Sequence, residues 1–444
     1  MTNLVKDIKS HKKIIAVYGL GNVGGAIAAS WLRVGAKVIG VDVSKNLLKD
    51  IQKGHSHKKE PFVSEVFSNA LKKNNFELTD DGVYASKVSD IKIIVVPVAI
   101  TKKKTDLSKV IAVAKTISQG LKKNDVVILS PSVPPGTTEK TLLPILEKGS
   151  NLKGEKDFLV IYNPERIFEG RAIQDIEENY PAIIAGLGKQ STHYGENLLK
   201  IISKKGVLVM SNLSTAEAEK LFEGVYRDVN IALANQLAGF CSKTGINFWE
   251  ARKAANSQPF CNLHYPGTGV GGLCIPVYPR IIIESSKSVK VPSQIIETSR
   301  EINDGMPKKC TLESIKLFKK FRNHSKISKI AILGLGFRGE VTDKRLSPTY
   351  DLIKELQRYN SKIFVHDPYI LHDEELPSTV KLTNNLQDVI KNADLIIVST
   401  DHKKYAVLSE SSFKNAKQPA IIFDGRNILN KSKFKTAKIQ TIGT

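Results

Sequence analysis

The chain has 444 residues, of which 41% are hydrophobic, so it is long enough for two or three globular domains. No apolar run reaches the roughly 18–20 residues of a membrane span, and the amino-terminal segment has no apolar stretch like that of a signal peptide, so we expect a cytoplasmic protein without membrane insertion. The net charge of +22 comes from scattered lysines without a nucleic-acid-binding motif, which argues against a nucleic-acid partner. The four cysteines form no CxxC pair, which argues against a disulfide framework and a metal site.

The first part of the chain alternates short apolar runs with helical patterns. Apolar runs bounded by Gly, Pro or Asp predict strands, and the helical stretches between them predict the crossovers of a doubly wound parallel sheet. The predicted strands lie within residues 13–21, 36–42, 90–98, 124–132, 157–165 and 180–188.

The first predicted strand runs into a glycine motif, GLGNVG, at residues 19–24. In such a turn the first glycine permits the tight bend, the second lets a pyrophosphate approach, and the third allows close helix packing. Asp42 ends the next strand, where an acid would hold the ribose hydroxyls of NAD and disfavour NADP. The pattern predicts an NAD site made by Gly19, Gly21, Asn22, Val23, Gly24 and Asp42; the alternative is a glycine turn without a cofactor.

Two later loops carry polar side chains directly after predicted strands. The first, SPSVPPGTT, covers residues 130–138, and the second, NPERIFEG, places Glu165 and Glu169 beside Arg166. Open α/β sheets bind ligands at the carboxyl ends of their strands. We therefore treat both loops as candidate ligand contacts, although each polar side chain taken singly could equally form a surface ion pair or a cap.

The middle of the chain predicts one long helix over residues 212–243 and a second helical stretch over 292–321. Ser214 and Glu217 match a capping box at the start of the long helix. Lys220 and Arg227 follow on this helix at a spacing that places two cations on one face.

The stretch GTGVGGLCIPVYP, residues 267–279, places Cys274 after a run of glycines. A thiolate is a strong nucleophile for carbonyl carbons. Bare backbone lets a substrate come close and offers amide donors that could lower the thiol pKa. The alternative is that Cys274 is a small buried side chain, which is the usual environment of a free cysteine.

The last part of the chain returns to alternation, with strands predicted within 328–336, 361–368, 393–401 and 420–425. A second motif, GLGFRG at 334–339, repeats the shape of the first, and the flanking Arg338 and Arg345 suit a nucleotide diphosphate better than a second NAD. The alternative is a duplicated domain that lost its ligand. We expect an α/β fold of two doubly wound Rossmann-like domains joined by a helical central domain, with boundaries at 1–208, 209–322 and 323–444.

These motifs together resemble the nucleotide-sugar 6-dehydrogenases, the family that includes UDP-glucose, UDP-N-acetylmannosamine and UDP-N-acetylglucosamine dehydrogenases. The resemblance covers nearly the whole chain and follows the order of the family's motifs. They are GLGNVG, SPSVPPGTT, NPERIFEG, AEKLFEGVYRDVNIALANQL (218–237), PGTGVGGLCIP (266–276), ETSREINDGMP (297–307), GLGFRGEVTDKRLSP (334–348) and FDGRNIL (423–429).

The resemblance implies oxidation of the C6 alcohol of a UDP-sugar to a uronic acid with two NAD, through a thiohemiacetal and a thioester on a cysteine. It implies that Cys274 is that cysteine, that Lys220 stabilises oxyanions or orients water, and that Glu165 serves the hydrolysis step, while Ser132 stands where threonine is usual. Pro97 would contact the cofactor, and the long helix would form a homodimer. The implied substrate contacts are Glu169, Arg227, His264, Gly271, Arg338 and Arg345.

The sequences of the long helix and of the loop at residues 267–279, called here the cysteine loop, resemble the UDP-N-acetylhexosamine branch more than the UDP-glucose branch. The chain departs from the family pattern at Gly224, Tyr278 and Phe260, where Asn, Asp and Arg are common. The alternatives are a UDP-glucose 6-dehydrogenase, a two-electron hydroxyacid or 6-phosphogluconate-type dehydrogenase that does not need Cys274, and a nucleotide-sugar-binding homologue with weakened catalysis.

Overall fold

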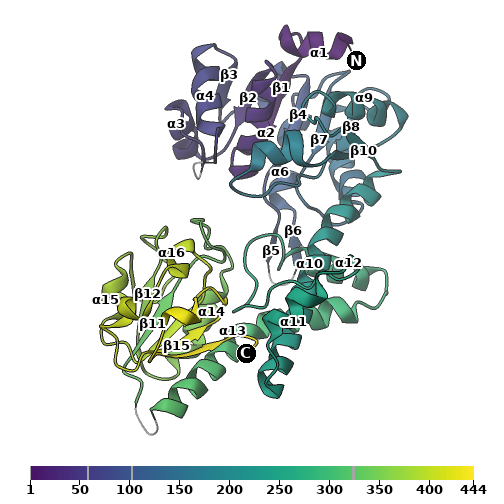
Figure 1. Ribbon diagram of the computed structural model, residues 1–444. Helices are drawn as coiled ribbons and strands as arrows, with labels where there is room; N and C mark the ends of the chain where they lie inside the picture. The colour runs from purple at the N-terminus through teal and green to yellow at the C-terminus, as the bar shows by residue number, and fades with distance from the viewer. Residues whose placement is uncertain (1, 58–59, 102–103, 323–325) are drawn as a thin grey trace. The chain divides into compact units, whose positions relative to one another are not determined.

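The computed structural model describes residues 2–57, 60–101, 104–322 and 326–444 (Figure 1). The predicted fold class is confirmed, because two Rossmann-like sheets of mainly parallel strands are separated in the sequence by long helices. The chain divides into two compact units, Met1–Glu223 with Arg280–Val289, and Gly224–Pro279 with Lys290–Thr444. The division into three domains stays a prediction. No helix in the described part of the chain is long and apolar enough to cross a membrane.

The sheet of the first unit has eight strands in the order β10-β9-β8-β7-β4-β1-β2-β3. The strands predicted from apolar runs are all present, and short strands at both edges add to them. The strands are β1 (Ile14–Tyr18), β2 (Lys37–Val41), β3 (Phe76–Thr79), β4 (Ile91–Ile94), β7 (Val126–Leu129), β8 (Leu159–Tyr162), β9 (Ala182–Gly186) and β10 (Val207–Val209), and the hairpin β5 (Ala99–Thr101) with β6 (Lys104–Asp106) lies outside the sheet.

One prediction about this sheet was wrong, because it is not parallel throughout. β9 pairs antiparallel with β8, and β10 then runs parallel to β9. Parallel neighbours need a crossover that spans the sheet, usually a helix. The connection between β8 and β9 holds only the short helix α8 (Ala172–Gln174) and a further turn at 175–179, so the chain returns in the opposite direction.

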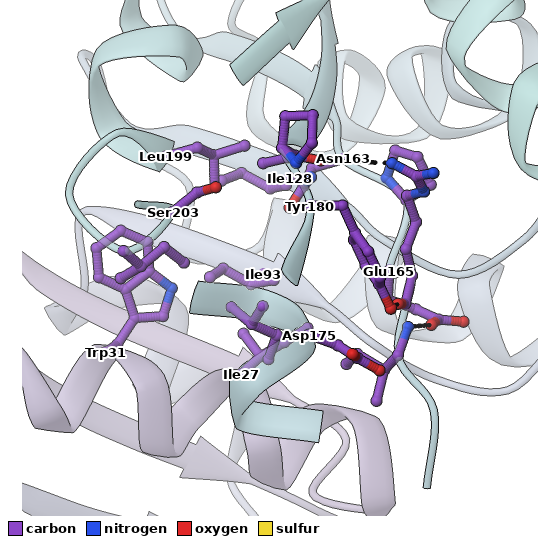
Figure 2. A pocket seen from close by; sticks show the side chains of 17 residues that line it. Ile27, Trp31, Ile93, Ile128, Asn163, Glu165, Asp175, Tyr180, Leu199 and Ser203 are labelled. Carbon is purple, nitrogen blue, oxygen red and sulfur yellow. Dashed lines mark hydrogen bonds between the residues drawn. The ribbon is translucent and has the colours of Figure 1, made fainter. Parts of the chain in front are cut away.

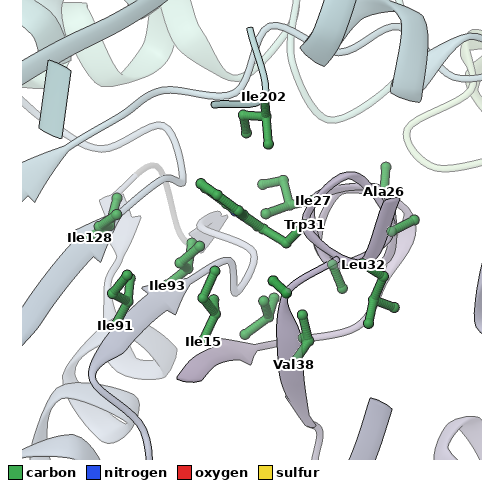
Figure 3. Close-up of a cluster of buried hydrophobic side chains, with 14 of the residues drawn as sticks. Ile15, Ala26, Ile27, Trp31, Leu32, Val38, Ile91, Ile93, Ile128 and Ile202 are labelled. Carbon is green, nitrogen blue, oxygen red and sulfur yellow. The ribbon is translucent and has the colours of Figure 1, made fainter. Parts of the chain in front are cut away.

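Helices cover the first sheet, and α2 (Asn22–Arg33) carries the centre of its core (Figure 3). The Trp31 indole is 1% exposed and lies among Ile27, Ile93, Ile128 and Ile202. This packing fixes α2, and with it the glycine turn, against the sheet. The other helices of this unit are α1 (Thr2–Lys9), α3 (Lys45–Gln52), α4 (Val63–Lys72), α5 (Gly82–Val88), α6 (Ser108–Ser118), α7 (Leu143–Ser150) and α9 (Lys189–Leu199).

The long helix predicted over 212–243 is α10 (Leu213–Thr244), and the one predicted over 292–321 is α13 (Gln294–Phe321). The predicted capping box was wrong. The Asn212 side chain accepts the N–H of Thr215 at 2.8 Å, so Asn212 caps the helix and Ser214 lies inside the first turn. Two shorter helices follow α10, namely α11 (Phe248–Ala255) and α12 (Tyr278–Ser288).

The sheet of the second unit has six parallel strands in the order β13-β12-β11-β14-β15-β16. Their bounds are β11 (Lys329–Leu333), β12 (Lys362–His366), β13 (Val380–Thr383), β14 (Leu395–Val398), β15 (Ile421–Asp424) and β16 (Lys438–Thr441), with helices α14 (Pro348–Gln357), α15 (Leu386–Ile390) and α16 (Lys403–Ala406). The second glycine motif differs from the first, contrary to expectation. It is followed by a loop, and α14 begins only at Pro348, so this turn does not open a helix.

Candidate active site

The first glycine turn has the shape that the motif predicts. Gly19 adopts a φ of +97°, and a Cβ there would lie 2.8 Å from the Val95 carbonyl oxygen. A Cβ on Gly24 would lie 1.8 Å from the Gly19 carbonyl oxygen, so α2 can approach the strand only without a side chain. A Cβ on Gly21 would meet nothing within 4 Å. The turn is therefore open on the side of Gly21, at the amino terminus of α2, where an anionic group is favoured.

Polar side chains surround this opening. The Asp42 carboxylate accepts the N–H groups of Leu20 at 2.8 Å and Ser44 at 2.9 Å, which holds it beside the turn. The Asn22 side-chain amide donates to Glu169 at 3.3 Å, and Asn22 Oδ1 is buried with no hydrogen-bond partner among the described residues. The turn and the NPERIFEG loop thus meet through Asn22 and Glu169.

Two further residues belong to the predicted cofactor site, one in α2 and one after β4. Val23 is partly buried and packs against the core of the first unit. Pro97 is exposed and follows β4, which is the sheet neighbour of β1. All residues predicted to contact the cofactor therefore follow the carboxyl ends of three adjacent strands, β2, β1 and β4.

A cluster of charged side chains joins the NPERIFEG loop to α10 within the first unit. Lys220 is 7% exposed, and its Nζ lies 3.9 Å from carboxylate oxygens of both Glu165 and Glu223. Arg166 donates to Glu223 at 2.8 Å through Nε and pairs with it at 2.7 Å through Nη2. The structure thus brings the predicted residues Glu165 and Lys220 together, and Glu223 holds both Lys220 and the loop.

A small apolar cavity of about 50 Å³ lies beneath this loop (Figure 2). Figure 2 shows Glu165 and Tyr180 on the side of the cavity opposite Trp31. The Tyr180 hydroxyl donates to the Arg166 carbonyl, and the Arg166 guanidinium lies 4.9 Å from the centre of the Tyr180 ring. These contacts fix the backbone that follows Glu165, since the Ile167 N–H also donates to the Glu165 carboxylate at 3.1 Å.

Glu217 anchors the SPSVPPGTT loop to α10. Its carboxylate is fully buried and accepts the N–H groups of Gly136 and Thr138 together with the Thr138 hydroxyl. In the same loop the Ser132 hydroxyl is buried and has no hydrogen-bond partner in the described part of the chain. A buried hydroxyl without a partner is a ready contact for a bound group. Glu217, which matched a capping box in the sequence, therefore serves to join this loop to α10.

Glu219 is a carboxyl group whose charge is disfavoured. Burial raises its pKa to about 7, with a further increase from Glu223 and an opposing effect of Arg166, whose Nε is 3.9 Å away. Glu219 therefore keeps its proton in the folded protein over a pH range in which it loses it in the unfolded chain.

This raised pKa predicts a change in the pH dependence of stability. Between the normal pKa and about 7 the folded state binds more protons than the unfolded state, so Glu219 lowers the free energy of unfolding as pH rises. Glu219→Gln is expected to raise the melting temperature by about 2–4 °C at pH 8 and by less at pH 5. Glu223→Gln is the matched control, because it breaks the Arg166 pair and lowers the melting temperature. An equal change in melting temperature for Glu219→Gln at pH 5 and pH 8 would contradict the raised pKa of Glu219.

In the second unit, the glycines before Cys274 are required by packing. A Cβ on Gly271 would lie 2.5 Å from the Phe337 Cβ, and one on Gly272 would lie 3.0 Å from the Phe337 ring. The Gly272 N–H donates to the Arg345 carbonyl at 2.9 Å. The bare backbone thus fits against the second glycine turn, rather than only leaving space for a ligand as expected, and Cys274 itself is exposed.

A buried polar network lies behind the cysteine loop. Asp228 is fully buried and pairs with Arg300 at 2.5 Å, and the Asn303 side chain donates to the Asp228 carboxylate at 2.8 Å. The Asn235 side-chain amide donates to Asn303 at 2.9 Å, and its oxygen accepts the Gly267 N–H at 2.9 Å. This network joins α10, α13 and the start of the loop, and it accounts for Asp228 and Arg300 of the two helix motifs.

His264 lies in an electropositive part of the second unit. Burial lowers its pKa, and Arg227 and Arg252 lower it further, so the ring is neutral near pH 7. His264 Nε2 is buried and has no hydrogen-bond partner among the described residues. The Arg252 side chain donates to the His264 carbonyl at 2.9 Å, and Arg227 is exposed. This group can offer cations and one neutral imidazole to an anionic ligand.

The acid beside the second glycine turn is enclosed, whereas Asp42 beside the first is only partly buried. Asp367, which follows β12, is fully buried and accepts four backbone N–H groups, those of residues 335, 336, 369 and 370. Although burial alone would raise it, His402 and these amides lower the pKa of Asp367 to about 2. Its carboxylate is occupied by the turn itself, whereas Arg338 is only partly buried and Arg345 is exposed and pairs with Asp343.

Several residues of the site had escaped the sequence analysis. Glu223 and Asp228 are acidic residues on α10 whose partners lie far away in the sequence. Arg426 donates to the carbonyls of Ser399 and Phe337 and lies over Gly267; its only signal was the FDGRNIL motif. Within the described residues, no group of three His, Cys, Asp or Glu side chains is placed to hold a metal ion.

Comparison with known proteins gives consistent matches along the chain. Residues 13–203, 214–305 and 331–431 match the NAD binding, central and UDP binding domains of the UDP-glucose/GDP-mannose dehydrogenase family. A UDP-N-acetyl-D-mannosamine dehydrogenase of Pyrococcus horikoshii is 32% identical over 94% of this chain and 96% of its own length.

Solved structures agree. A UDP-D-ManNAc dehydrogenase from P. horikoshii has a TM-score of 0.87 and 31% identity, covering 97% of this chain and 99% of that one. A UDP-N-acetyl-mannosamine dehydrogenase from Staphylococcus aureus has a TM-score of 0.85 and 28% identity, covering 97% and 98%.

Proposed function

Because the chain belongs to the UDP-glucose/GDP-mannose dehydrogenase family, we propose that it oxidises the C6 alcohol of a UDP-N-acetylhexosamine, first of all UDP-N-acetylmannosamine, to the uronic acid. The observation that carries the proposal is the exposed thiol of Cys274 on a loop held by backbone packing, in a chain whose relatives over nearly its full length include several UDP-N-acetylmannosamine dehydrogenases. Of the other three cysteines, two are buried and one is half-buried.

The first glycine turn fits the cofactor of this family, whose NAD binding domain matches residues 13–203. The open face at Gly21 leaves room for a pyrophosphate at the amino terminus of α2, and Asp42 stands where the adenosine ribose would be held. The unpartnered Asn22 oxygen, Val23 and Pro97 complete the contacts that we propose. A four-electron oxidation releases two hydrides, so two NAD molecules would bind there in turn and each would accept one hydride.

The residues of the chain serve the carbon chemistry. The Cys274 thiolate forms a carbon–sulfur bond with the C6 aldehyde and gives a thiohemiacetal, whose oxidation gives a thioester. Water then attacks the thioester carbon, the carbon–sulfur bond breaks, and the thiolate and the uronic acid are released. The Lys220 ammonium stabilises the oxyanion of each tetrahedral species, and Glu165, paired with Lys220 at 3.9 Å, accepts the proton of the attacking water.

We propose that the nucleotide half of the substrate lies at the second glycine turn, in the domain whose family model is the UDP binding domain. Arg338 and Arg345 would contact the diphosphate, because cations compensate its charge. Arg227, His264 and Gly271 would contact the sugar or its phosphate, and Ser132 and Glu169 would contact the sugar from their loops. The orphaned His264 Nε2 and Ser132 hydroxyl support these roles.

We also propose a cytoplasmic homodimer formed through α10. Four large apolar side chains are exposed on this helix, and at 100° per residue they fall within about 40° of one another. They are Phe222, Tyr226, Leu233 and Phe240, which are 59%, 52%, 44% and 59% exposed. A stripe of this kind is typical of a helix that packs against a second helix. The four free cysteines support a reducing compartment.

The proposal is tested by the amount of NADH formed per UDP-sugar consumed. Purified protein is expected to give two NADH and one uronic acid per UDP-N-acetylmannosamine, and a lower kcat/KM with UDP-N-acetylglucosamine and UDP-glucose. One NADH per sugar would contradict the thioester route. Measurable binding of all three UDP-sugars without NADH would favour a binding protein over an enzyme.

A further inference from the structure

The Tyr278 ring packs against the backbone of α10 at Gly224, within the second unit. A Cβ on Gly224 would lie 2.4 Å from Cδ2 of the Tyr278 ring, 3.0 Å from its Cβ and 3.1 Å from its Cγ. Tyr278 is 6% exposed. The ring therefore occupies the space that any side chain at residue 224 would need, and it packs directly on the Gly224 backbone.

Tyr278 is also tied to Cys274 through the backbone. The Cys274 carbonyl accepts the N–H of Tyr278 at 2.9 Å and that of Val277 at 3.1 Å, which closes a tight turn at the start of α12. A turn held by two hydrogen bonds moves as one piece, so a displacement of the Tyr278 ring shifts the backbone of Cys274 with it.

The other end of the cysteine loop is held independently. Gly271 and Gly272 lie against Phe337, and the Gly272 N–H donates to Arg345. Cys274 lies between these two attachments and is exposed. The cysteine is therefore held from both ends of its loop, and the contact through Tyr278 rests on α10.

From these contacts we infer that Tyr278 is a positioning residue for the reactive thiol, and that its ring sets the place of Cys274 by resting on the bare backbone of Gly224. The pair works as one unit, because a side chain at residue 224 and a ring at residue 278 exclude each other. The inference rests on the proposed function only where turnover is measured.

The test uses the full chain with Gly224→Ala, which adds a single methyl group beneath the ring. Gly305→Ala is the matched control, because Gly305 is also helical and a Cβ there meets nothing within 4 Å. The first readout is the rate at which iodoacetamide alkylates Cys274 without substrate, followed by peptide mass mapping. The second is the split between kcat and KM with UDP-N-acetylmannosamine.

Gly224→Ala is expected to change the alkylation rate several-fold and to lower kcat by about 10–100-fold, since a shift of about 1 Å costs that much, while KM stays within about two-fold. In a Tyr278→Leu background the same methyl group is expected to add less than about a two-fold effect, because the ring is gone. Gly305→Ala should leave both readouts unchanged.

An unchanged alkylation rate in Gly224→Ala, or an equal effect of Gly224→Ala in both backgrounds, would overturn the inference. If Gly224→Ala does not fold, Tyr278→Leu alone carries the test, and an unaltered alkylation rate in that variant would overturn it too. Alkylation needs no substrate, so an altered rate without any turnover of UDP-sugars would support the positioning role while contradicting the proposed function.

Discussion

Replacing Cys274 with alanine is expected to lower the rate of uronic acid formation by a factor on the order of 10³ or more, as the loss of a covalent nucleophile does elsewhere. Without the thiol, the C6 aldehyde has no partner with which to form the thiohemiacetal, so the second oxidation has no substrate. Binding of the UDP-sugar is expected to change little, because the loop is shaped by packing of its glycines and not by the cysteine side chain. The measurement is uronic acid by mass spectrometry beside NADH by absorbance.

Cys261→Ala is the control for this variant. Cys261 is half-buried and its thiol donates to the Asn256 side chain at 3.5 Å. It is expected to keep the wild-type rate. Acid formation by Cys274→Ala at a rate near that of wild type would remove the thioester route and favour a second oxidation of the hydrated aldehyde without a covalent intermediate.

Arg300→Met is expected to lower the free energy of unfolding by about 3–5 kcal/mol, the range for breaking one side of a buried ion pair. Asp228 is fully buried, and burial already raises its pKa despite the nearby guanidinium. Removing Arg300 leaves that carboxylate with the Asn303 amide alone, so its charge is poorly compensated. Urea denaturation at pH 7 measures the change.

The double variant Asp228→Leu with Arg300→Met separates the loss of a partner from the loss of the pair. When both charges are removed, the desolvation cost disappears with the attraction, and most of the stability is expected to return. A loss below about 1 kcal/mol for Arg300→Met alone would show that the pair is not the main support of this region.

Much of the fold could be predicted because its signals are local. Apolar runs that end in glycine or proline gave the central strands, and four-residue spacing gave α10 almost to its ends. The direction of β9 could not be predicted, since it depends on the absence of a long helix between β8 and β9. The absence of a helix directly after the second glycine turn could not be predicted either. Six residues that resemble the first turn do not specify the conformation of the residues after them.

In the candidate site, too, features with local signals could be predicted and contacts between distant residues could not. The glycine turn and Asp42 were recognisable because spacing along the chain reflects their geometry. Glu217 was misread, since a local capping pattern and a contact with a distant loop look alike in the sequence. Gly224 and Tyr278 were noted as two separate departures from the family, and only the structure shows that they touch.

The long helix α10 carries the loop anchor at Glu217, the contact with Tyr278 at Gly224 and the network residues Asp228 and Asn235, at intervals of about one or two turns. Inserting one residue into an α-helix turns everything beyond it by about 100° and advances it by about 1.5 Å. A single insertion or deletion within this helix would therefore undo several distant contacts at once, whereas a point substitution disturbs one. Evolutionary change in this segment should thus proceed by exchange of residues at constant length, and changes in chain length should be confined to the loops.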